Sequence, residues 1–533
     1  MTEGKEEVRE LPKGWVLTTV KETIKIIDYR GRTPPYSENG VPHLRSSNIR
    51  NRKIVWENLR YVSEETYQAY MTRGLPEKGD VLFTTEAPLG EVALAPEQRF
   101  SLAQRMMILR PIKDLLLSKF LLYQIENEDF QRKLSKSGTG TTVTGVSSRN
   151  FQPTPIILAP LNEQNRIVEK IEELFSELDQ GIESLKTTQK QLKVYRQAVL
   201  KWAFEGKLTE EWRKQHQSTL KTGEALLTQI KAERENRYQQ QLAEWETAVK
   251  EWEAIGKVGR KPTKPQNSKD FSLLTQSENS NLPKLSDGWG WERAGNIFSE
   301  INNGHTPTKE KLNPSSGEVP FLKVYNLTHN GSLDFKDLTF IARETHKLEL
   351  TRSIVYPDDV LFNIVGPPLG KVSLVPPEYS EYNINQAVVV FRPNKRYLAK
   401  FLMYALLTRS VITWILSTGK ATAGQTNLKV SSCREQPLPV CSTEEQERIV
   451  EEIESRLSIC DQLEATIIEN LQKAEALRQS ILKQAFEGKL VPQDPNDEPA
   501  ETLLDRIQAE RQVNGNTGKK SKPSHQQLTF QEL

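Results

Sequence analysis

The residues of this sequence that could carry out chemistry are few and scattered. The six histidines and the cysteines Cys433, Cys441 and Cys460 have no spacing typical of a metal site or a redox pair. The glycine-rich run SGTGTTVTGV (residues 137–146) lacks the lysine of a phosphate-binding loop, and we expect a flexible loop there. The acidic pair in PDD (residues 357–359) is not followed by Glu-x-Lys at the spacing of a nuclease. We therefore expect no catalytic residue and no metal ligand in this chain.

One tetrapeptide has a weak chemical signal. TPPY (Thr33–Tyr36) faintly resembles the catalytic tetrapeptide of adenine methyltransferases. Thr33 stands where that motif needs an acidic or amide residue, and no glycine-rich cofactor loop accompanies it. We interpret the tetrapeptide as a turn.

One long stretch occurs twice. Residues 163–208 and 445–490 align without a gap, and both begin with EQxRIVExIE and end with RQxxLKxAFEGKL. Apolar residues recur in heptads, which predicts two long helices that bury this seam against each other. In the first copy the seam contains Ile167, Ile171, Leu174, Leu178, Leu185, Leu192, Tyr195, Val199 and Trp202. In the second it contains Ile449, Ile453, Leu463, Ile467, Leu477 and Ile481.

The ends of the two predicted helices carry further signals. Ser442 and Glu445 have the spacing of a capping box, and Gly206 and Gly488 are natural helix stops. The run AFEGKL is repeated letter for letter, including a polar Glu and Lys that a coiled coil alone does not require. We interpret this identity as a sign that two copies of one partner use these ends.

The segments before the two helices repeat a second set of landmarks. GDVLFTTEAPLGEVAL (residues 79–94) corresponds to DDVLFNIVGPPLGKVSL (residues 358–374), and AQRMMILRP (residues 103–111) to NQAVVVFRP (residues 385–393). Short β-rich runs separated by Gly and Pro indicate a small strand-rich fold, with one helical pattern at residues 115–134. The residues between the landmarks differ freely, so we expect two modules of one fold with different surfaces.

These patterns predict an α+β protein built as an internal repeat with a pseudo-twofold relation. The expected parts are module 1 (residues 1–160), the first long helix (161–208), a polar helical extension and linker (209–281), module 2 (282–440), the second long helix (441–490), and a helical echo with a disordered tail (491–533). Within the extension, we expect a helix over residues 224–254 and a linker over residues 256–281. The sequence EALLTQIKAER (residues 224–234) returns as ETLLDRIQAER (residues 501–511), and we expect disorder from Gly515 onward.

Composition limits the classes of function. The net charge is +2 and the hydrophobic fraction is 36%, which suits two modest modules joined by solvated helices. The modules are mildly basic and the helical parts are acidic, as expected if the modules contact nucleic acid. No apolar run is long enough to span a membrane, the first residues do not look like a signal peptide, and the sparse cysteines indicate a reducing compartment. We expect a cytoplasmic protein.

The chain resembles the specificity subunit of type I restriction–modification enzymes over nearly its whole length. The resemblance rests on the helix starts NEQNRIV (residues 162–168) and EEQERIV (residues 444–450), on the duplicated AFEGKL, and on the order DVLF, LG, Q, RP in both modules. It implies that each module is a target recognition domain for one half of a bipartite DNA sequence. It also implies that the long helices pair as an antiparallel coiled coil that sets the gap. The insertion at residues 234–281 departs from the family pattern.

The same resemblance implies partners and cofactors. Double-stranded DNA, two methyltransferase subunits and a translocase–nuclease subunit would bind this chain, which itself would be non-catalytic. It would hold no cofactor, and S-adenosylmethionine, ATP and Mg²⁺ would belong to the partner subunits.

Candidate DNA contacts are the polar and basic residues that lie between the shared landmarks. Arginine and asparagine can read guanine and adenine edges, and other polar groups can hold phosphates. The candidates are Arg32, Arg45, Ser47, Asn48, Arg50 and Arg149 in module 1, and His305, Lys323, Tyr325, Asn326, Lys420 and Gln425 in module 2. Arg110 and Arg392, which each precede a repeated proline, are expected to be structural.

Two other functions remain open at this point. One is a non-enzymatic coiled-coil scaffold whose modules bind peptides, and salt-sensitive DNA binding would argue against it. The other is a DNA-modifying enzyme with an unrecognised site, which would have to transfer methyl groups without a partner.

Overall fold

A computed structural model of the chain describes residues 11–29, 33–138, 145–265, 270–313, 316–366, 369–418, 420–422 and 425–517. The chain divides into two compact units. Unit 1 comprises residues 1–186 and 467–533, and unit 2 comprises residues 187–466. Each unit therefore contains one module together with parts of both long helices.

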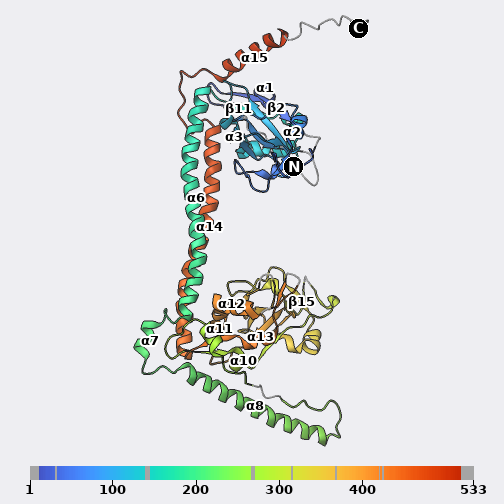
Figure 1. The fold of residues 1–533 in the computed structure, drawn as a ribbon, viewed down its shortest axis with the longest axis vertical. Coiled ribbons are helices and arrows are strands. Elements are labelled where there is room, and N and C mark those ends of the chain that lie inside the picture. Colours follow the sequence, from blue (N-terminus) through green and yellow to red (C-terminus); the bar gives the residue numbers. More distant parts are fainter. Residues whose placement is uncertain are drawn as a thin grey trace, which may run out of the picture. The chain divides into compact units, whose positions relative to one another are not determined.

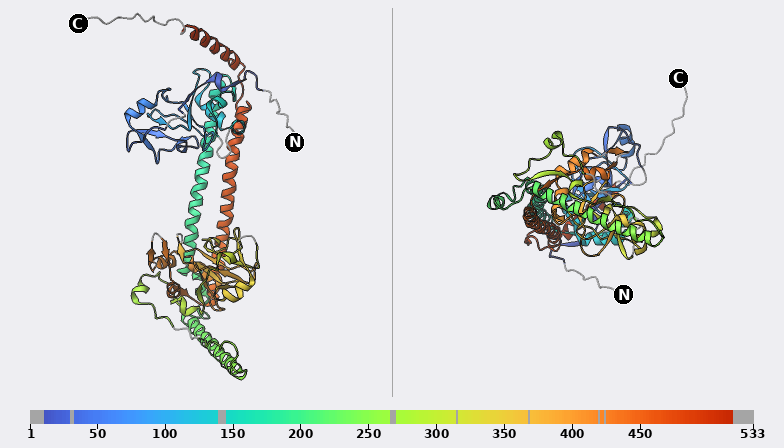
Figure 2. Two further views of the ribbon diagram at one scale, coloured as in Figure 1. Left: turned by 90° about the vertical axis from the view of Figure 1, so that its right-hand side faces the viewer. Right: turned by 90° about the horizontal axis from the view of Figure 1, so that it is seen from below.

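The two long helices are α6 (Leu161–Phe204) and α14 (Thr443–Phe486). They run side by side in opposite directions (Figures 1 and 2), so the start of α6 lies with the end of α14 in unit 1. Both helices end two residues before a glycine with positive φ, +70° at Gly206 and +69° at Gly488. The α+β class, the internal repeat and the pairing of the long helices are thereby confirmed.

Module 1 is built around an antiparallel sheet of order β2-β10-β7-β8. These strands are β2 (Ile24–Asp28), β10 (Met106–Pro111), β7 (Val81–Thr84) and β8 (Val92–Leu94). A second sheet has the order β6-β3-β9, with β3 (Val41–Leu44) antiparallel to β6 (Arg60–Val62) and parallel to β9 (Ser101–Leu102). Two strand pairs complete the module: β1 (Val16–Thr19) with β11 (Pro155–Leu158), and β4 (Ile49–Arg50) with β5 (Lys53–Ile54). Its helices are α1 (Val20–Thr23), α2 (Glu64–Tyr70), α3 (Ser118–Glu126), α4 (Glu128–Ser137) and α5 (Ser148–Phe151).

Module 2 repeats this topology. The order β2-β10-β7-β8 returns as β13 (Ile301–Asn303), β21 (Val388–Phe391), β17 (Val360–Asn363) and β19 (Val372–Leu374). The second sheet returns as β15 (Thr339–Ile341), β14 (Val319–Leu322), β20 (Tyr382–Ile384) and β16 (Ile354–Val355), again with one parallel pair, β14 with β20. Further pairs are β12 (Gly290–Arg293) with β24 (Pro437–Val440), and β23 (Gln425–Asn427) with β18 (Val365–Gly366) and β22 (Lys420–Thr422). Its helices are α10 (Ala294–Ile297), α11 (Ala399–Leu406), α12 (Arg409–Thr418) and α13 (Val430–Glu435).

The repeated DVLF landmark is a central strand that is buried on both faces. In β7, Val81 and Phe83 belong to one hydrophobic core and Leu82 belongs to another. In β17, Val360 and Phe362 likewise face one core and Leu361 faces the other. A strand covered on both sides needs an unbroken apolar run, which explains why the three apolar residues Val-Leu-Phe recur.

Each module's larger core is completed by the two long helices. In unit 1 this core includes Ile167 and Ile171 from the start of α6 and Leu482 and Phe486 from the end of α14. In unit 2 the equivalent core includes Ile449 and Ile453 from the start of α14 and Leu200 and Phe204 from the end of α6. Each module is thus packed on its own helix start and on the helix end of the other repeat.

The segments after the long helices also repeat. After α6 come α7 (Glu210–His216) and α8 (Gly223–Ala254), and after α14 comes α15 (Ala500–Thr517). Gly223 donates its backbone N–H to the carbonyl of Gly288 (2.7 Å), and Ala500 donates its own to the carbonyl of Gly14 (2.8 Å). The first residues of α8 and α15 therefore hydrogen-bond to the glycines that precede Trp289 and Trp15, respectively.

Three sequence expectations need correction. The helical pattern at residues 115–134 is two helices, because Asn127 ends α3 and caps α4 by accepting the N–H of Asp129 (2.9 Å). The expected linker contains α9 (Gln276–Ser280), and residues 257–265 return along α8 (Figure 1). There the indoles of Trp245 and Trp252 donate to the carbonyls of Pro262 and Gly259, respectively. α15 extends to Thr517, so residues 515–517 are helical. Residues 518–533, and most of the glycine-rich run at 139–144, lie outside the described ranges.

Candidate nucleic-acid interface

Each module is anchored to its helix start by a tryptophan and a glutamate. The indole N–H of Trp15 donates to Glu163 Oε2 (2.9 Å), and that of Trp289 donates to Glu445 Oε2 (2.8 Å). Ser442 accepts the N–H of Glu445 (3.2 Å) as a cap, but the Glu445 carboxylate binds the module and does not close the expected capping box. The anchor explains why the dipeptide Gly-Trp and the helical Glu recur together.

The glutamine that follows each anchoring glutamate holds the module's first core helix. Gln164 accepts the N–H of Leu117 (2.9 Å) and donates to the carbonyls of Leu115 and Ala159. Gln446 accepts the N–H of Leu398 (2.9 Å) and donates to the carbonyls of Arg396 and Cys441. Both glutamine side chains are fully buried, so the repeated Glu-Gln pair serves to hold each module on its long helix.

Packing accounts for much of the repeated AFEGKL. Phe486 lies 5.1 Å from the ring of Phe120, and Phe204 lies 5.1 Å from that of Phe401. The two stop glycines leave no room for a side chain, since a Cβ on Gly206 would meet Ser286 and one on Gly488 would meet Pro12. The Glu and Lys form the same local ion pair in both copies (2.7 and 2.8 Å). Use of these ends by partners stays a prediction.

Four of the module 1 candidates lie close together within residues 45–50, which we call the candidate edge of module 1. Arg45, Ser47 and Asn48 lie in the short segment that links β3 to β4, and Arg50 is the second residue of β4. Ser47 is exposed, whereas Arg45 and Arg50 are half-buried and donate to the carbonyls of Asn58 and Ile49. Asn48 is only 3% exposed, and its amide accepts the N–H of Arg45 (3.0 Å) and donates to the carbonyl of Val55 (3.1 Å).

The equivalent edge of module 2 carries three candidates. Lys323 Nζ lies 5.7 Å from the centre of the Tyr325 ring and donates to the hydroxyl of Thr339 (3.0 Å). Tyr325 is 49% exposed. Asn326 is buried and makes the same two bonds as Asn48, accepting from Lys323 N–H and donating to the carbonyl of Asp334 (both 2.9 Å). The shared asparagines thus shape the edge, and the residues around them differ between the modules.

The other candidates lie elsewhere. Arg149 is exposed on α5, and His305 is exposed in the segment after β13. Lys420 and Gln425 belong to the paired strands β22 and β23. Arg32 lies outside the described residues.

Arg110 and Arg392 are structural, as their repetition led us to expect. Arg110 donates from Nε and Nη2 to the two carboxylate oxygens of Asp80 (2.9 and 2.8 Å). Arg392 binds Asp359 in the same way (3.0 and 2.9 Å). The aspartates are the first letters of the repeated DVLF, and both are buried. These ion pairs fix the backbone at the start of β7 and of β17.

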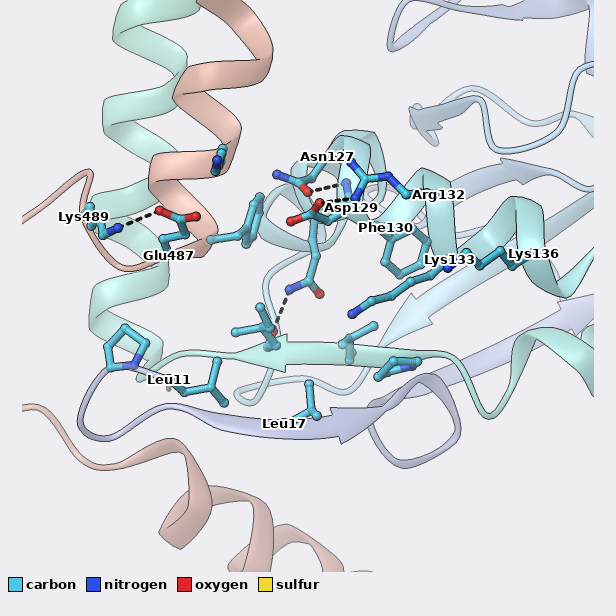
Figure 3. A pocket seen from close by; sticks show the side chains of 17 residues that line it. Leu11, Leu17, Asn127, Asp129, Phe130, Arg132, Lys133, Lys136, Glu487 and Lys489 are labelled. Carbon is cyan, nitrogen blue, oxygen red and sulfur yellow. Dashed lines mark hydrogen bonds and ion pairs between the residues drawn. The ribbon is translucent and has the colours of Figure 1, made fainter. Parts of the chain in front are cut away.

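A cavity of about 730 Å³ lies in unit 1, where the end of α14 meets module 1. Its apolar wall includes Leu11, Leu17 and Phe130, and Figure 3 shows Arg132, Lys133, Lys136 and Lys489 around it. Glu487 pairs with Lys489 (2.8 Å) and Asp129 with Arg132 (3.2 Å). Within the described ranges, no group of three or more His, Cys, Asp or Glu side chains is placed to hold a metal ion.

The heptad seam is only partly buried. Ile167, Ile171, Leu192 and Val199 are buried as expected, and so are Ile449, Ile453, Ile467 and Ile481. Tyr195 and Trp202 are each 38% exposed, and Leu463 and Leu477 are 47% and 51% exposed. The expectation that these four are buried in the seam was wrong. All four stand at one of the two heptad positions, and the facing helix covers mainly the other, where Leu192 and Ile467 are buried.

Acidification is expected to destabilise module 1 through His43. Burial lowers the pKa of the His43 imidazole to about 4, and its Nδ1 lies 2.8 Å from the hydroxyl of Ser101. The unfolded chain takes up this proton near pH 6.5 and the folded chain only near pH 4, so stability falls as pH drops through this window. Between pH 7.5 and pH 5 the loss should be about 2 kcal/mol, measurable by urea unfolding.

Module 2 supplies the control for this experiment. Phe321 occupies the position in β14 that His43 occupies in β3, since each pairs in parallel with the returning strand. His43→Phe should remove this part of the pH dependence. An unchanged loss of stability in the variant would show that His43 is not its source.

Comparison with known proteins defines the class. The model of the family described as type I restriction modification DNA specificity domain matches residues 12–192 and again residues 288–473. The chain therefore belongs to this family and carries two target recognition domains. It is a specificity subunit, so its role in such a system is recognition and not catalysis.

Two curated relatives align over most of their length. The chain is 24% identical to the type I restriction enzyme EcoKI specificity subunit of Escherichia coli strain K12, over 96% of this chain and 98% of the relative. It is 25% identical to the EcoBI specificity subunit of Escherichia coli, over 90% of each chain. A solved structure, described as bearing on complex assembly and conformational transition of the type I R-M system, shares the fold with a TM-score of 0.61. It has 18% identity and covers 90% of this chain and 99% of that one. Among the described residues, no helix is both long and apolar enough to cross a membrane.

Proposed function

We propose that the chain gives a type I restriction–modification complex its DNA sequence specificity, with each module reading one half of a bipartite site. The observation that carries this is the pair of equivalent edges. Both are shaped by a buried asparagine, Asn48 or Asn326, yet one presents Arg45 and Ser47 and the other Lys323 and Tyr325. One fold with two different polar edges is what an asymmetric, split site requires.

The long helices fit the role of a spacer and docking platform. At 1.5 Å per residue, the 44 residues of α6 give a length of about 66 Å, equivalent to about 19 base pairs. The exposed Tyr195, Trp202 and Leu463 offer an apolar surface to further helices, and two methyltransferase subunits would bind along α6 and α14. A translocase–nuclease subunit would complete the complex. S-adenosylmethionine, ATP and Mg²⁺ would then be held by these partners, in the cytoplasm.

The test is co-expression with its methyltransferase subunit in cells that lack other adenine methylation, followed by mapping of methylated adenines. A split motif with a fixed, non-specific gap is the expected result. A stable complex that leaves the genome unmethylated, and that binds DNA without a salt-dependent affinity, would contradict the proposal.

Arg45→Ala is expected to weaken recognition at one half-site. If Arg45 reaches a base edge, its loss should cost about 1–3 kcal/mol, or about 10- to 100-fold in affinity of the assembled complex. The measurement is binding to duplexes that carry the mapped site. Lys21→Ala, which removes an exposed cation on α1, is the matched control. Full affinity for the Arg45 variant would remove this residue from the interface.

A further inference from the structure

The candidate edge of module 1 ends in a turn of unusual backbone geometry. β4 and β5 are joined by Asn51 and Arg52, whose φ values are +48° and +65°. This left-handed region is disfavoured for residues with a Cβ, and an arginine needs support to stay there. Local backbone preference therefore does not explain why an arginine stands at this position of the turn.

Arg52 extends from the turn to the long helices. Its guanidinium lies 4.8 Å from the centre of the Phe175 ring on α6. Its nitrogens lie 3.6 Å from Glu126 Oε1 on α3 and 3.7 Å from Asp179 Oδ2 on α6. The side chain is only 20% exposed. A guanidinium in this position combines a cation–π contact with two ion pairs.

A second arginine joins α14 to the same place. Arg478 lies 4.5 Å from the centre of the Phe175 ring and forms an ion pair with Asp179. Its neighbour Gln479 accepts the N–H of Glu128 (3.2 Å) and donates to the carbonyl of Glu126 (3.4 Å). The turn, α3, α6 and α14 thus meet in one cluster, which we call the Arg52 cluster: Arg52, Glu126, Phe175, Asp179 and Arg478.

The Arg52 cluster is poorly suited to stability alone. Within the described part of the chain, Glu126 Oε2 and Arg478 Nη1 are buried without a hydrogen-bond partner. Burial raises the pKa of Glu126 to about 7, and the two guanidiniums only partly oppose this. An apolar cluster of similar size would pack as well without this desolvation. Charged groups at this junction instead give the turn a directional attachment.

Module 2 lacks the cluster. Arg52 forms a parallel bridge with Ala93, and the equivalent bridge joins Gly331 to Ser373, so Gly331 takes the place of Arg52. A Cβ on Gly331 would meet Met403, so that turn packs directly on α11. Leu117 and Leu398 donate to equivalent glutamines, and counting onward from them places Leu407 at the position of Glu126. Counting onward from the anchoring glutamates of the two long helices places Leu457 at the position of Phe175. Only the helix-to-helix pair is repeated, as Arg196 with Asp461 (2.5 Å).

We infer that Arg52 is a positioning residue that fixes the DNA-reading edge of module 1 against the two long helices. This inference rests on the proposed function, because it assigns the edge from Arg45 to Arg50 to DNA. Recognition by module 1 is thereby tied to the helices that would carry the methyltransferases. Module 2 achieves the same placement by direct packing.

The test uses the complete complex with its methyltransferase subunits and duplexes carrying the mapped site. Arg52→Ala should relax discrimination between correct and single-substituted versions of one half-site by about tenfold, and leave discrimination at the other half-site unchanged. Arg52→Lys keeps the charge but cannot stack as a planar group, and should restore less than half of the loss. Phe175→Leu, which introduces the module 2 residue, should shift discrimination in the same direction.

Matched controls separate positioning from general stability. Lys119→Ala removes another link between module 1 and α6, the ion pair with Glu172 (2.7 Å), without touching the turn, and should leave discrimination unchanged. Normal discrimination by both Arg52→Ala and Phe175→Leu in folded complexes would overturn the inference. So would an equal loss at both half-sites, or the same loss in the Lys119 variant. Failure of the unmodified complex to bind a split site would instead contradict the proposed function.

Discussion

Arg110→Ala is expected to reduce the free energy of unfolding of module 1 by about 3–5 kcal/mol. Asp80 is only 4% exposed, and both of its carboxylate oxygens accept hydrogen bonds from the Arg110 guanidinium. Arg110 also donates to the carbonyl of Leu75 (2.7 Å). Removing the guanidinium leaves a buried carboxylate whose remaining partner is the N–H of Glu77 (2.8 Å). Urea unfolding of the purified chain measures the loss.

The repeat offers an internal control for this prediction. Arg392→Ala should have an effect of the same size in module 2, where burial raises the pKa of Asp359 and the guanidinium opposes that rise. Hydrogen exchange should then show lost protection in β7 and β10 for the first variant and in β17 and β21 for the second. The double variant Arg110→Ala with Asp80→Asn should recover part of the stability. A loss below about 1 kcal/mol for Arg110→Ala would mean that the pair is worth no more than a surface ion pair.

The architecture was predictable where the sequence repeats itself. Two runs of the same apolar heptads identified α6 and α14, and glycines at equal positions marked where both helices stop. The landmark DVLF was recognisable because a strand buried on both faces needs consecutive apolar residues. The helix at residues 224–254 was predicted almost to the residue, because its polar, glycine-free sequence leaves no other regular structure.

The pairing between repeats was not predictable. Nothing in the pattern of Phe204 or Phe486 shows that each completes the core of the module belonging to the other repeat, because an apolar residue does not specify its partner. Asn48 and Asn326 illustrate a second limit. Their residue type suits adenine recognition, but the same amide can shape a turn, and only the observed hydrogen bonds show that both ends of the amide are occupied. Arg52 was not distinguished from its neighbours, since its left-handed backbone and its contact with Phe175 depend on the fold.

The two anchoring glutamates show how equivalent positions can differ in energy. Glu163 accepts from Trp15, whereas Glu445 accepts from Trp289 and also from Thr209 (2.9 Å) and Arg213 (2.8 Å). Arg213 comes from α7, a helix that follows α6. Glu445 thus joins the segment that follows α6 to the start of α14 by a charged, buried contact.

Glu445→Ala is therefore expected to cost about 3 kcal/mol or more, and Glu163→Ala about 1–2 kcal/mol. The larger loss arises because three donors, one of them charged and 17% exposed, lose their acceptor. The smaller loss is that of the indole hydrogen bond and of contacts with Gln493 and the Arg166 charge, for a carboxylate whose pKa burial already raises. Urea unfolding gives the two free energies, and hydrogen exchange of β1 and β12, which follow Trp15 and Trp289, reports the local release of each module.

Arg213→Ala separates the two contributions at Glu445. If the guanidinium accounts for the difference, Arg213→Ala should bring the cost of a further Glu445→Ala change close to that of Glu163→Ala. Such non-additivity is expected for groups in direct contact. Equal losses for the two single glutamate variants would show that the Arg213 contact adds nothing and that both modules are held by the indole alone. A larger loss for Glu445→Ala would show that the contacts of Thr209 and Arg213 add to the anchor of module 2.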